Sequence, residues 1–431
     1  GSGGVATFAG GINNNVGGAI SDNTTATNGG GVNVQGGSFS MTVSFMGNNR
    51  ANGASSTGGG VAIAGAGVNL SKSTLSNNTA TTFGGGIKNI GISTINIIGS
   101  SLSGNLAGNG GGGIDNTGLG AMTITNSTIS GNSATGPAGS GGGLRTQHAV
   151  VNLFSATVAD NSAGASGGGV TQLAGASDVF LRNTIVANNT APVAPDCSAG
   201  AGNPATSQGH NLIENTSGCS LVGDPTGNVT GQDPQLGPLA DTGCPTTCYQ
   251  LLPLSPALET ANPAAPGSGG NATPADDQRG AVRPQGPRAD IGSVEQGGTA
   301  LPTLSMSATF GAPEGAFGTA NIAVTLSPAS TQTVTVKAAS YRLSAQAPDD
   351  YMTVPDIDLT FLPTETLKHV PVTVNNDTLV ESDESFVVYI YQAVNASIKP
   401  GSGHTVLTIQ NDDLPALSIA EASGPSPNFP S

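Results

Sequence analysis

The chain is dominated by a motif of three glycines and one aliphatic residue, repeated between residues 29 and 170. The six copies are Gly29–Val32, Gly58–Val61, Gly84–Ile87, Gly111–Ile114, Gly141–Leu144 and Gly167–Val170. Their first glycines are 29, 26, 27, 30 and 26 residues apart. An asparagine two positions before an alanine recurs in step, at Asn49, Asn78, Asn105, Asn132, Asn161 and Asn189. Two markers that share one period predict a repeat architecture.

The residue types between the markers favour stacked strands over stacked helices. The region is rich in Gly, Ser, Thr, Asn and β-branched residues, in short apolar/polar alternations that glycines interrupt. One turn of a parallel β-helix needs a few short strands and tight corners, which suits 26–30 residues. Equivalent positions then lie about 4.8 Å apart from coil to coil. We therefore predict an all-β fold with a parallel β-helix over residues 1–190.

Stacking of the coils predicts two ladders of side chains. The aliphatic ladder inside the coils would contain Leu75, Leu102, Ile129, Val158 and Ile185. The six repeated asparagines would form a polar ladder at a corner, where their amides bond to one another and their backbone tolerates a left-handed conformation. The glycine triplets fit places where the chain bends sharply or backbones approach closely.

The paired elements Gly-Gly-(Ala/Gly)-(Ile/Val/Leu) and hydrophobic-x-x-Asn, as in Phe45–Asn48, give the first family resemblance. Over residues 10–190 the chain resembles the repeats of polymorphic outer-membrane proteins and related bacterial surface proteins. The resemblance implies a right-handed parallel β-helix of the cell surface. Because the chain starts in mid-repeat, without Met or a signal peptide, we expect it to be a mature or fragmentary piece of a longer protein.

Four cysteines lie close together, at positions 197, 219, 244 and 248. Their even number and the extracellular character of the chain favour disulfides, with Cys197–Cys219 and Cys244–Cys248 as the preferred pairs. A zinc site is the alternative, although the spacing is not a paired CxxC and only His210 is near.

Residues 191–296 break the repeat with prolines and long loops. The motifs in this stretch are Asp196-Cys197, Gly209–Ile213, Gly218-Cys219, Asp233–Asp241, Leu252–Ala257, Asp276–Gly280, Arg283-Pro284 and Asp290–Gly292. The run resembles the end of secreted choice-of-anchor proteins, where such a stretch closes the β-helix, and this implies a disulfide-bearing lid. Asp277, Arg279, Arg283 and Asp290 could form a catalytic cluster, but we favour a buried, salt-bridged plug.

A short linker at 297–302 leads into strands of strict alternation. We expect strands at Ala320–Leu326, Thr333–Ala338, Leu359–Leu362, Lys368–Val374, Ser385–Tyr391 and Thr405–Gln410. Short strands separated by turn residues predict a β-sandwich over 303–413. The same region contains five motifs in order: Pro313–Gly315, Asp349–Tyr351, Asn375–Asp377, Glu381–Phe386 and Asn411–Asp413. They resemble the Calx-beta domain, which implies an immunoglobulin-like fold.

The acidic residues of those motifs fall at strand ends and in loops. Close carboxylates repel one another unless a hard cation lies between them. The resemblance implies that Ca²⁺ would be held by Glu314, Asp350, Asp377, Glu381, Glu384, Asp412 and Asp413. Asn376 departs from the pattern, because calcium-binding relatives often have another acid there. The alternative is a set of solvated acidic loops without an ion.

The last segment, 414–431, begins like the first strand of another copy of the same domain. Its alternating residues Leu417 and Ile419 have no strand of their own to pair with. We expect either the start of a further domain or an arm that adds a strand to a neighbouring subunit. Such head-to-tail contacts that do not close produce filaments.

Charge and composition narrow the function classes. The net charge of −15 argues against nucleic acid or an anionic membrane as a partner, and no apolar run is long enough to span a bilayer. Residues 1–190 contain only four acids, the chain has no Trp, and its four histidines are scattered. We therefore expect no enzyme activity, although many parallel β-helices cleave polysaccharides.

Three functions remain open. The preferred one is an extracellular structural protein of the bacterial surface that assembles with itself into a filament or layer. The second is an adhesin, with the β-helix as a stalk that binds surface glycans or other cell-surface proteins. The third is a polysaccharide-active enzyme.

Overall fold

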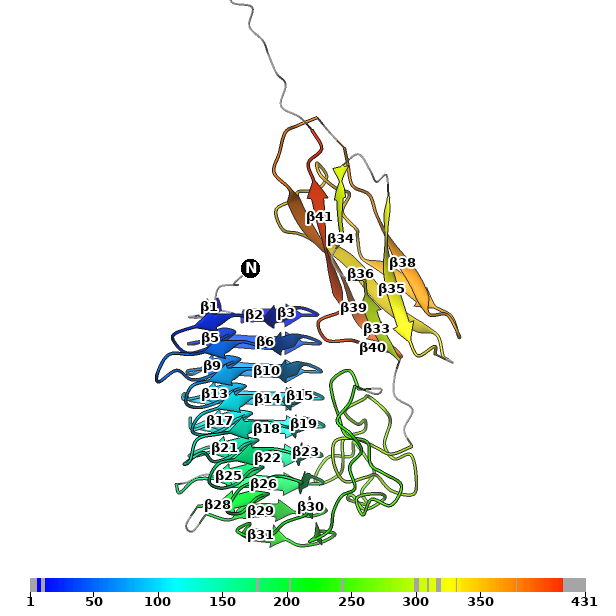
Figure 1. Ribbon diagram of the computed structural model, residues 1–431. Helices are drawn as coiled ribbons and strands as arrows, with labels where there is room; N and C mark the ends of the chain where they lie inside the picture. The colour runs from blue at the N-terminus through cyan, green and yellow to red at the C-terminus, as the bar shows by residue number, and fades with distance from the viewer. Residues whose placement is uncertain are drawn as a thin grey trace, which may run out of the picture.

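The computed structural model describes residues 6–8, 12–175, 178–200, 203–241, 244–297, 302–307, 310–314, 319–330, 332–376 and 378–413. All regular structure in these residues is β, and none of them forms a helix that could cross a membrane. Figure 1 shows a stack of coils, a loop-rich segment along one side of the stack, and a separate β-sandwich beside its N-terminal end. The all-β prediction is therefore confirmed.

The N-terminal region is a parallel β-solenoid whose coils contribute strands to four parallel sheets. Sheet A contains β1 (Ala6–Phe8), β5 (Val32–Val34), β9 (Val61–Ile63), β13 (Ile87–Asn89), β17 (Ile114–Asn116), β21 (Leu144–Thr146), β25 (Val170–Gln172) and β28 (Cys197–Ala199). Sheet B contains β2 (Ile12–Val16), β6 (Ser38–Thr42), β10 (Gly67–Ser71), β14 (Ser93–Ile98), β18 (Gly120–Thr125), β22 (Val150–Phe154), β26 (Asp178–Arg182), β29 (Ala205–Gln208) and β31 (Leu221–Asp224).

The other two sheets complete each coil. Sheet C contains β3 (Ala19–Ser21), β7 (Phe45–Gly47), β11 (Thr74–Ser76), β15 (Ser101–Ser103), β19 (Thr128–Ser130), β23 (Thr157–Ala159), β27 (Ile185–Ala187), β30 (Leu212–Ile213) and β32 (Val229–Thr230). Sheet D contains β4 (Thr24–Thr25), β8 (Arg50–Ala51), β12 (Thr79–Ala80), β16 (Leu106–Ala107), β20 (Ser133–Ala134) and β24 (Ser162–Ala163).

The aliphatic ladder forms, with one error in its last member. Leu75 pairs with Leu102, and the register continues through Ile129 and Val158. The next partner of Val158 is Val186, whereas Ile185 pairs with Thr157 on the outer face of sheet C. Ile185 is nevertheless buried, in a second apolar cluster outside the coil. The sequence is ambiguous here because β27 is apolar on both of its faces.

The polar ladder also forms, and the hydrogen bonds from one asparagine side chain to the next all run in one direction. The Asn105 backbone N–H and Nδ2 both donate to Asn132 Oδ1, at 3.0 and 2.9 Å, and the other coils repeat this pattern. The predicted left-handed backbone lies one residue earlier than expected. Asn77 has a φ of 56°, and Gly104 occupies the equivalent corner of the next coil with a φ of 65°. This leaves the asparagine that follows each corner pointing inward.

The glycine triplets and the asparagine ladder belong to one packing arrangement. Gly84 has a φ of +65°, which L side chains rarely adopt. A Cβ on Gly85 would lie 2.4 Å from the carbonyl oxygen of Gly112 in the next coil. A Cβ on Gly86 would lie 3.2 Å from Cγ of the ladder residue Asn105. The shared period of the two markers therefore reflects direct contact.

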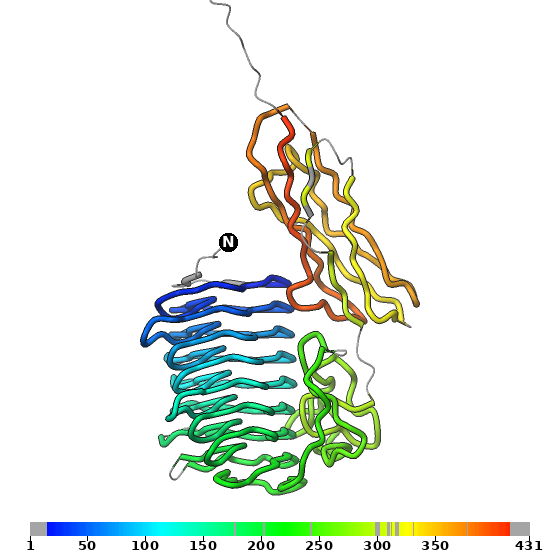
Figure 2. The backbone as a smooth tube through the Cα atoms, viewed as in Figure 1, coloured from blue at the N-terminus to red at the C-terminus, as the bar shows by residue number. Residues whose placement is uncertain are grey.

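The coils continue beyond the predicted boundary at residue 190, because parallel pairing extends to β31 and β32. The chain then turns back along the outer face of sheet C, visible as the green loops beside the stack (Figure 2). We call residues 231–297 the returning segment. Thr247 bonds to Ser101 over 2.7 Å, and Thr128 donates to Gln278 Oε1 over 2.7 Å. The segment predicted as an end lid therefore flanks the solenoid, because its polar side chains match those on sheet C.

Both disulfide pairs form as expected, between Cys197 and Cys219 and between Cys244 and Cys248.

The cluster that could be mistaken for a catalytic site is buried and internally paired. Arg279 contacts Asp277 over 2.7 Å, and Arg283 contacts Glu295 over 3.3 Å. The Asp290 carboxylate accepts backbone N–H groups of Glu259 and Gln296 instead of an arginine. These contacts fit a plug that holds the returning segment together.

The C-terminal β-sandwich has two sheets. The first contains β38 (Leu367–Val372), β35 (Ala320–Ser327), β33 (Thr303–Met306) and β40 (Ser397–Ile398). The second contains β34 (Phe310–Pro313), β41 (His404–Gln410), β39 (Glu384–Val394), β36 (Val334–Arg342) and β37 (Ile357–Phe361). Part of the linker, the tail 414–431 and its residues Leu417 and Ile419 lie outside the described residues.

The sandwich contacts the first coils of the solenoid through one corner. His404 Nδ1–H donates to the carbonyl oxygen of Gly17 over 2.8 Å. Val43, from the corner between β6 and β7, packs against the apolar core of the sandwich. A longer ion pair, Lys399 to Asp241 at 3.8 Å, links the sandwich to the returning segment.

Candidate metal centre

Three strand ends converge at the pole of the sandwich that lies away from the solenoid (Figure 1). β34 and β41 pair in parallel, with Pro313 opposite Gln410. Glu314 and the pair Asp412-Asp413 therefore emerge from the same end of neighbouring strands. β39 runs antiparallel to β41 and begins at Glu384, so its first acid reaches the same pole.

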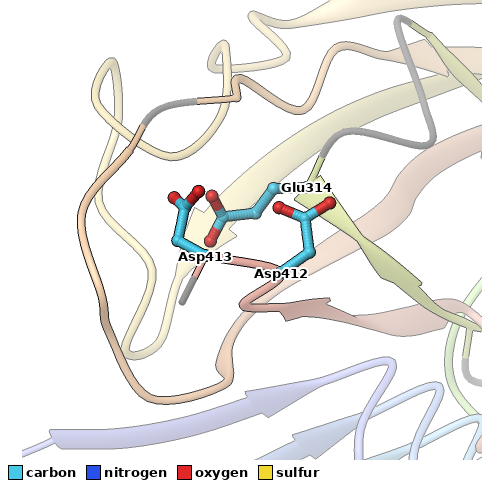
Figure 3. A group of neighbouring side chains, drawn as sticks. All are labelled: Glu314, Asp412 and Asp413. Atoms are coloured by element: carbon cyan, nitrogen blue, oxygen red, sulfur yellow. The ribbon is translucent and has the colours of Figure 1, made fainter. Parts of the chain in front are cut away.

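The first cluster consists of Glu314, Asp412 and Asp413. One carboxylate oxygen from each lies within 4.8 Å of the others. Figure 3 shows the three side chains converging from two strand ends. Glu314 is 7 % exposed. Asp413 Oδ2 is buried and has no hydrogen-bond partner among the residues that the structure describes. A buried carboxylate oxygen without a donor is costly unless a cation or donor reaches it.

The second cluster consists of Asp350, Glu381 and Glu384, again with one oxygen of each within 4.8 Å of the others. Asp350 lies in the loop between β36 and β37. The adjacent Tyr351 is 2 % exposed and stacks on Phe386 of β39, with ring centroids 3.8 Å apart. An aromatic anchor in the core therefore fixes the loop that carries Asp350 next to the start of β39.

Within the second cluster, the pKa of Glu384 is raised above its ordinary value. The hydrogen bond with Asp350 and, next, burial raise the pKa of Glu384 to about 7. The charges of Asp350, Glu381 and Glu314 act in the same direction. Because Glu314 belongs to the first cluster, the two clusters form one acidic pole. Carboxylates that share a proton can release it when a divalent cation binds.

The structure thus places six of the seven predicted ligands in two groups, whereas Asp377 lies outside the described residues. Further residues hold the loops of the two clusters together, and the sequence alone does not distinguish them. Asn411 Oδ1 accepts the backbone N–H of Glu381 over 3.3 Å, and Asn411 N–H donates to Asp383 Oδ1 over 3.4 Å. Asn411 and Asp383 stand within the motifs, but only the fold shows that they connect two loops.

The donor set fits a hard cation. All six side chains offer carboxylate oxygens, which Ca²⁺ prefers, and Ca²⁺ accepts six to eight such ligands in flexible geometry. Softer metals favour nitrogen or sulfur ligands, and neither cluster contains His or Cys. An ion bound here would join the ends of β34, β39 and β41.

The Calx-beta domain family matches residues 309–413. The crystal structure of the apo-form Calx CBD1 domain is similar at 16 % identity over 26 % of this chain and 99 % of its own, with a TM-score of 0.25. CBD12 from CALX1.2 gives 17 % identity over 26 % and 44 %, with a TM-score of 0.24.

A third structure, the calcium binding domain CBD12 of CALX1.1, gives 17 % identity over 26 % of this chain and 46 % of its own, with a TM-score of 0.24. No curated protein matches the chain significantly. The family match and the sandwich topology agree on the same residues. Residues 309–413 are therefore a Calx-beta domain, and it follows a parallel β-solenoid.

Proposed function

We propose that this chain is an extracellular structural protein whose Calx-beta domain binds Ca²⁺ at the acidic pole. The observation that carries the proposal is the pair of carboxylate clusters at one pole, one of which contains the unpartnered Asp413 Oδ2, in the part of the chain that the structure describes. The two disulfides fit an oxidising location outside the cytoplasm. Bound Ca²⁺ would offset part of the negative charge of the pole and stiffen the sandwich.

Calorimetric titration of the chain with CaCl₂ after chelator treatment tests the calcium site. We expect Asp413→Asn to weaken Ca²⁺ binding at least tenfold, because a charged ligand is lost. The matched control is Asp358→Asn, which removes an exposed acid from the same domain, 3.0 Å from Lys337. Absence of Ca²⁺ binding by the unaltered chain, or equal weakening by both variants, would reject the site.

We propose further that the solenoid associates end to end. The open edge of its last coil supports this, since β31 and β32 are the final strands of sheets B and C and are largely exposed. Unpaired strand edges favour strand addition by another chain. The strand addition to a neighbouring subunit that we predict for Leu417 and Ile419 remains a prediction.

Electron microscopy of the purified chain, with and without a calcium chelator, tests assembly. Regular filaments would support head-to-tail association, and their loss in chelator would connect assembly to the calcium site. Dispersed single rods under both conditions would contradict head-to-tail association.

We retain the expectation that the chain is not an enzyme. Release of reducing sugar from polysaccharides by the purified chain would overturn this expectation.

A further inference from the structure

An open polar groove of about 900 Å³ lies on the last coils of the solenoid. It is formed where the returning segment leaves the stack, so both the coil corners after sheet C and the first residues of that segment line it. Its chemistry comes mainly from Asp160, Thr190, Asp196, Glu214, Asn215 and Asp233. The calcium site and the sandwich contribute none of the residues that line it.

Three carboxylates of the groove are each fixed through a single oxygen. Asp160 Oδ2 accepts the Tyr249 hydroxyl. Glu214 Oε2 accepts the Asn188 backbone N–H over 2.7 Å, and Asp233 Oδ1 accepts that of Gln235 over 2.7 Å. The second oxygen of each carboxylate makes no hydrogen bond or ion pair with the described residues. These three oxygens are therefore positioned acceptors that a ligand can use.

The floor of the groove is rigid. Asp196 is 1 % exposed and ends the asparagine ladder, because its Oδ1 accepts Asn189 Nδ2 over 2.9 Å. Its Oδ2 accepts the Asn215 backbone N–H over 2.7 Å, so both oxygens are used by the fold. A fixed floor below outward-facing acceptors lowers the entropy cost of binding a ligand.

The arrangement selects the class of ligand. Asp160, Glu214 and Asp233 do not gather closely enough to hold one metal ion, since the described residues bring three such groups together only in the sandwich. No Lys or Arg lines the groove, which disfavours anionic ligands. The ligand must instead bring several separated donors, and ammonium groups complement the three carboxylates. The hydroxyl and amide groups of Thr190, Ser217 and Asn215 also line the groove, and these groups suit sugar hydroxyls.

We propose that this groove binds an oligosaccharide that carries free amino groups, as in a glucosamine polymer. The inference is independent of the calcium site, so it is tested in the presence of a chelator. The probe is a defined chitosan oligomer, with its fully N-acetylated counterpart and spermine as comparison ligands. Binding of each to the full chain is measured by calorimetry at constant ionic strength.

We expect the chitosan oligomer to bind, and Glu214→Gln or Asp233→Asn to weaken its binding about tenfold, as loss of a charged hydrogen bond does. Asp224→Asn is the matched control, because it removes one exposed acid of the last coil that does not line the groove. It should leave the affinity unchanged.

Three outcomes would overturn the proposal. Equal binding of the acetylated oligomer would show that the amino groups do not contribute to binding. Equal or tighter binding of spermine would show that the sugar does not contribute. Equal weakening by Asp224→Asn and Glu214→Gln would show that only the net charge of the chain attracts the oligomer.

Discussion

At the scale of single residues, the asparagine ladder shows how an amide can replace an apolar side chain inside the coils. Asn105 Nδ2 donates to the Leu75 carbonyl and to Asn132 Oδ1, and its Oδ1 accepts two N–H groups of Asn78. Asn105→Ala would leave these buried groups without partners. We expect it to lower the free energy of unfolding by about 3 kcal/mol.

Urea denaturation followed by circular dichroism measures this loss. Asn69→Ala is the control, because Asn69 lies on the solvent side of sheet B and accepts one exposed hydrogen bond from Asn96. It should change stability by less than about 0.5 kcal/mol. Similar losses for the two variants would mean that the buried ladder contributes no more than surface pairing.

The raised pKa of Glu384 predicts that the stability of the folded sandwich depends on pH. Without Ca²⁺ the pKa of Glu384 is about 7 in the folded chain, against an ordinary value of 4.5. The folded state therefore holds the proton more tightly, and this stabilisation is complete below about pH 4.5 and is lost as the pH rises through about 7.

In chelator we therefore expect the urea midpoint of the sandwich, followed by tyrosine fluorescence, to fall between pH 4.5 and 7 through this group. Glu384→Gln should flatten the profile, because the titrating carboxyl is gone. Saturating Ca²⁺ should reverse the trend, since the ion favours the ionised cluster. A profile unchanged by Glu384→Gln would contradict the shared proton.

At the scale of elements, close stacking of the coils depends on the middle glycine of each triplet. A Cβ on Gly85 would lie 2.4 Å from Gly112 O and 2.5 Å from backbone atoms of Leu106. These are backbone atoms of two different coils, so no side-chain rotation can relieve the clash. We expect Gly85→Ala to prevent folding or to lower the melting temperature sharply.

Gly65→Asn is the matched control for that variant. Gly65 has a positive φ of +78°, which Gly85 does not, but a Cβ at Gly65 would meet nothing within 4 Å. Asparagine tolerates this backbone region, so the variant should melt close to the unaltered chain. Thermal melting of both variants distinguishes crowding between coils from backbone conformation, and equal melting temperatures would contradict the stacking argument.

At the scale of the whole molecule, the sandwich is held against the solenoid by a small corner contact. Val43 packs on the sandwich core, and His404 at the start of β41 bonds to Gly17. β41 continues to the acids Asp412 and Asp413 at the opposite pole. One strand therefore joins the docking corner to the candidate calcium site.

Val43→Asp would place a charge in this contact, and we expect the sandwich to separate from the coils. Small-angle X-ray scattering should then report a larger radius of gyration. Lys72→Asp is the control, because Lys72 occupies the equivalent corner of the next coil. An unchanged radius for Val43→Asp would show that other contacts, such as Lys399 to Asp241, suffice to hold the sandwich.

Much of the fold and part of the site were predictable because local periodicity determines them. The glycine and asparagine markers repeat because these residues contact one another in neighbouring coils. Strict alternation of apolar and polar residues indicates the strands of the sandwich. The acids of the candidate site could be named because the motifs that contain them resemble those of the Calx-beta domain. Their division into two clusters, and the bracing by Asn411, depended on which loops the fold brings together.

The sequence by itself determined the coil, its period, its inward residues up to Val158 and the sandwich that follows. Tertiary structure alone decided where the returning segment lies. It therefore also decided that Ile185 is buried on the outer face of sheet C. Periodicity describes contacts between neighbouring coils, whereas the returning segment meets coils more than a hundred residues away, as in the bond from Thr128 to Gln278. Such non-repeating contacts leave no period in the chain, so only the folded molecule reveals the groove and the docking corner.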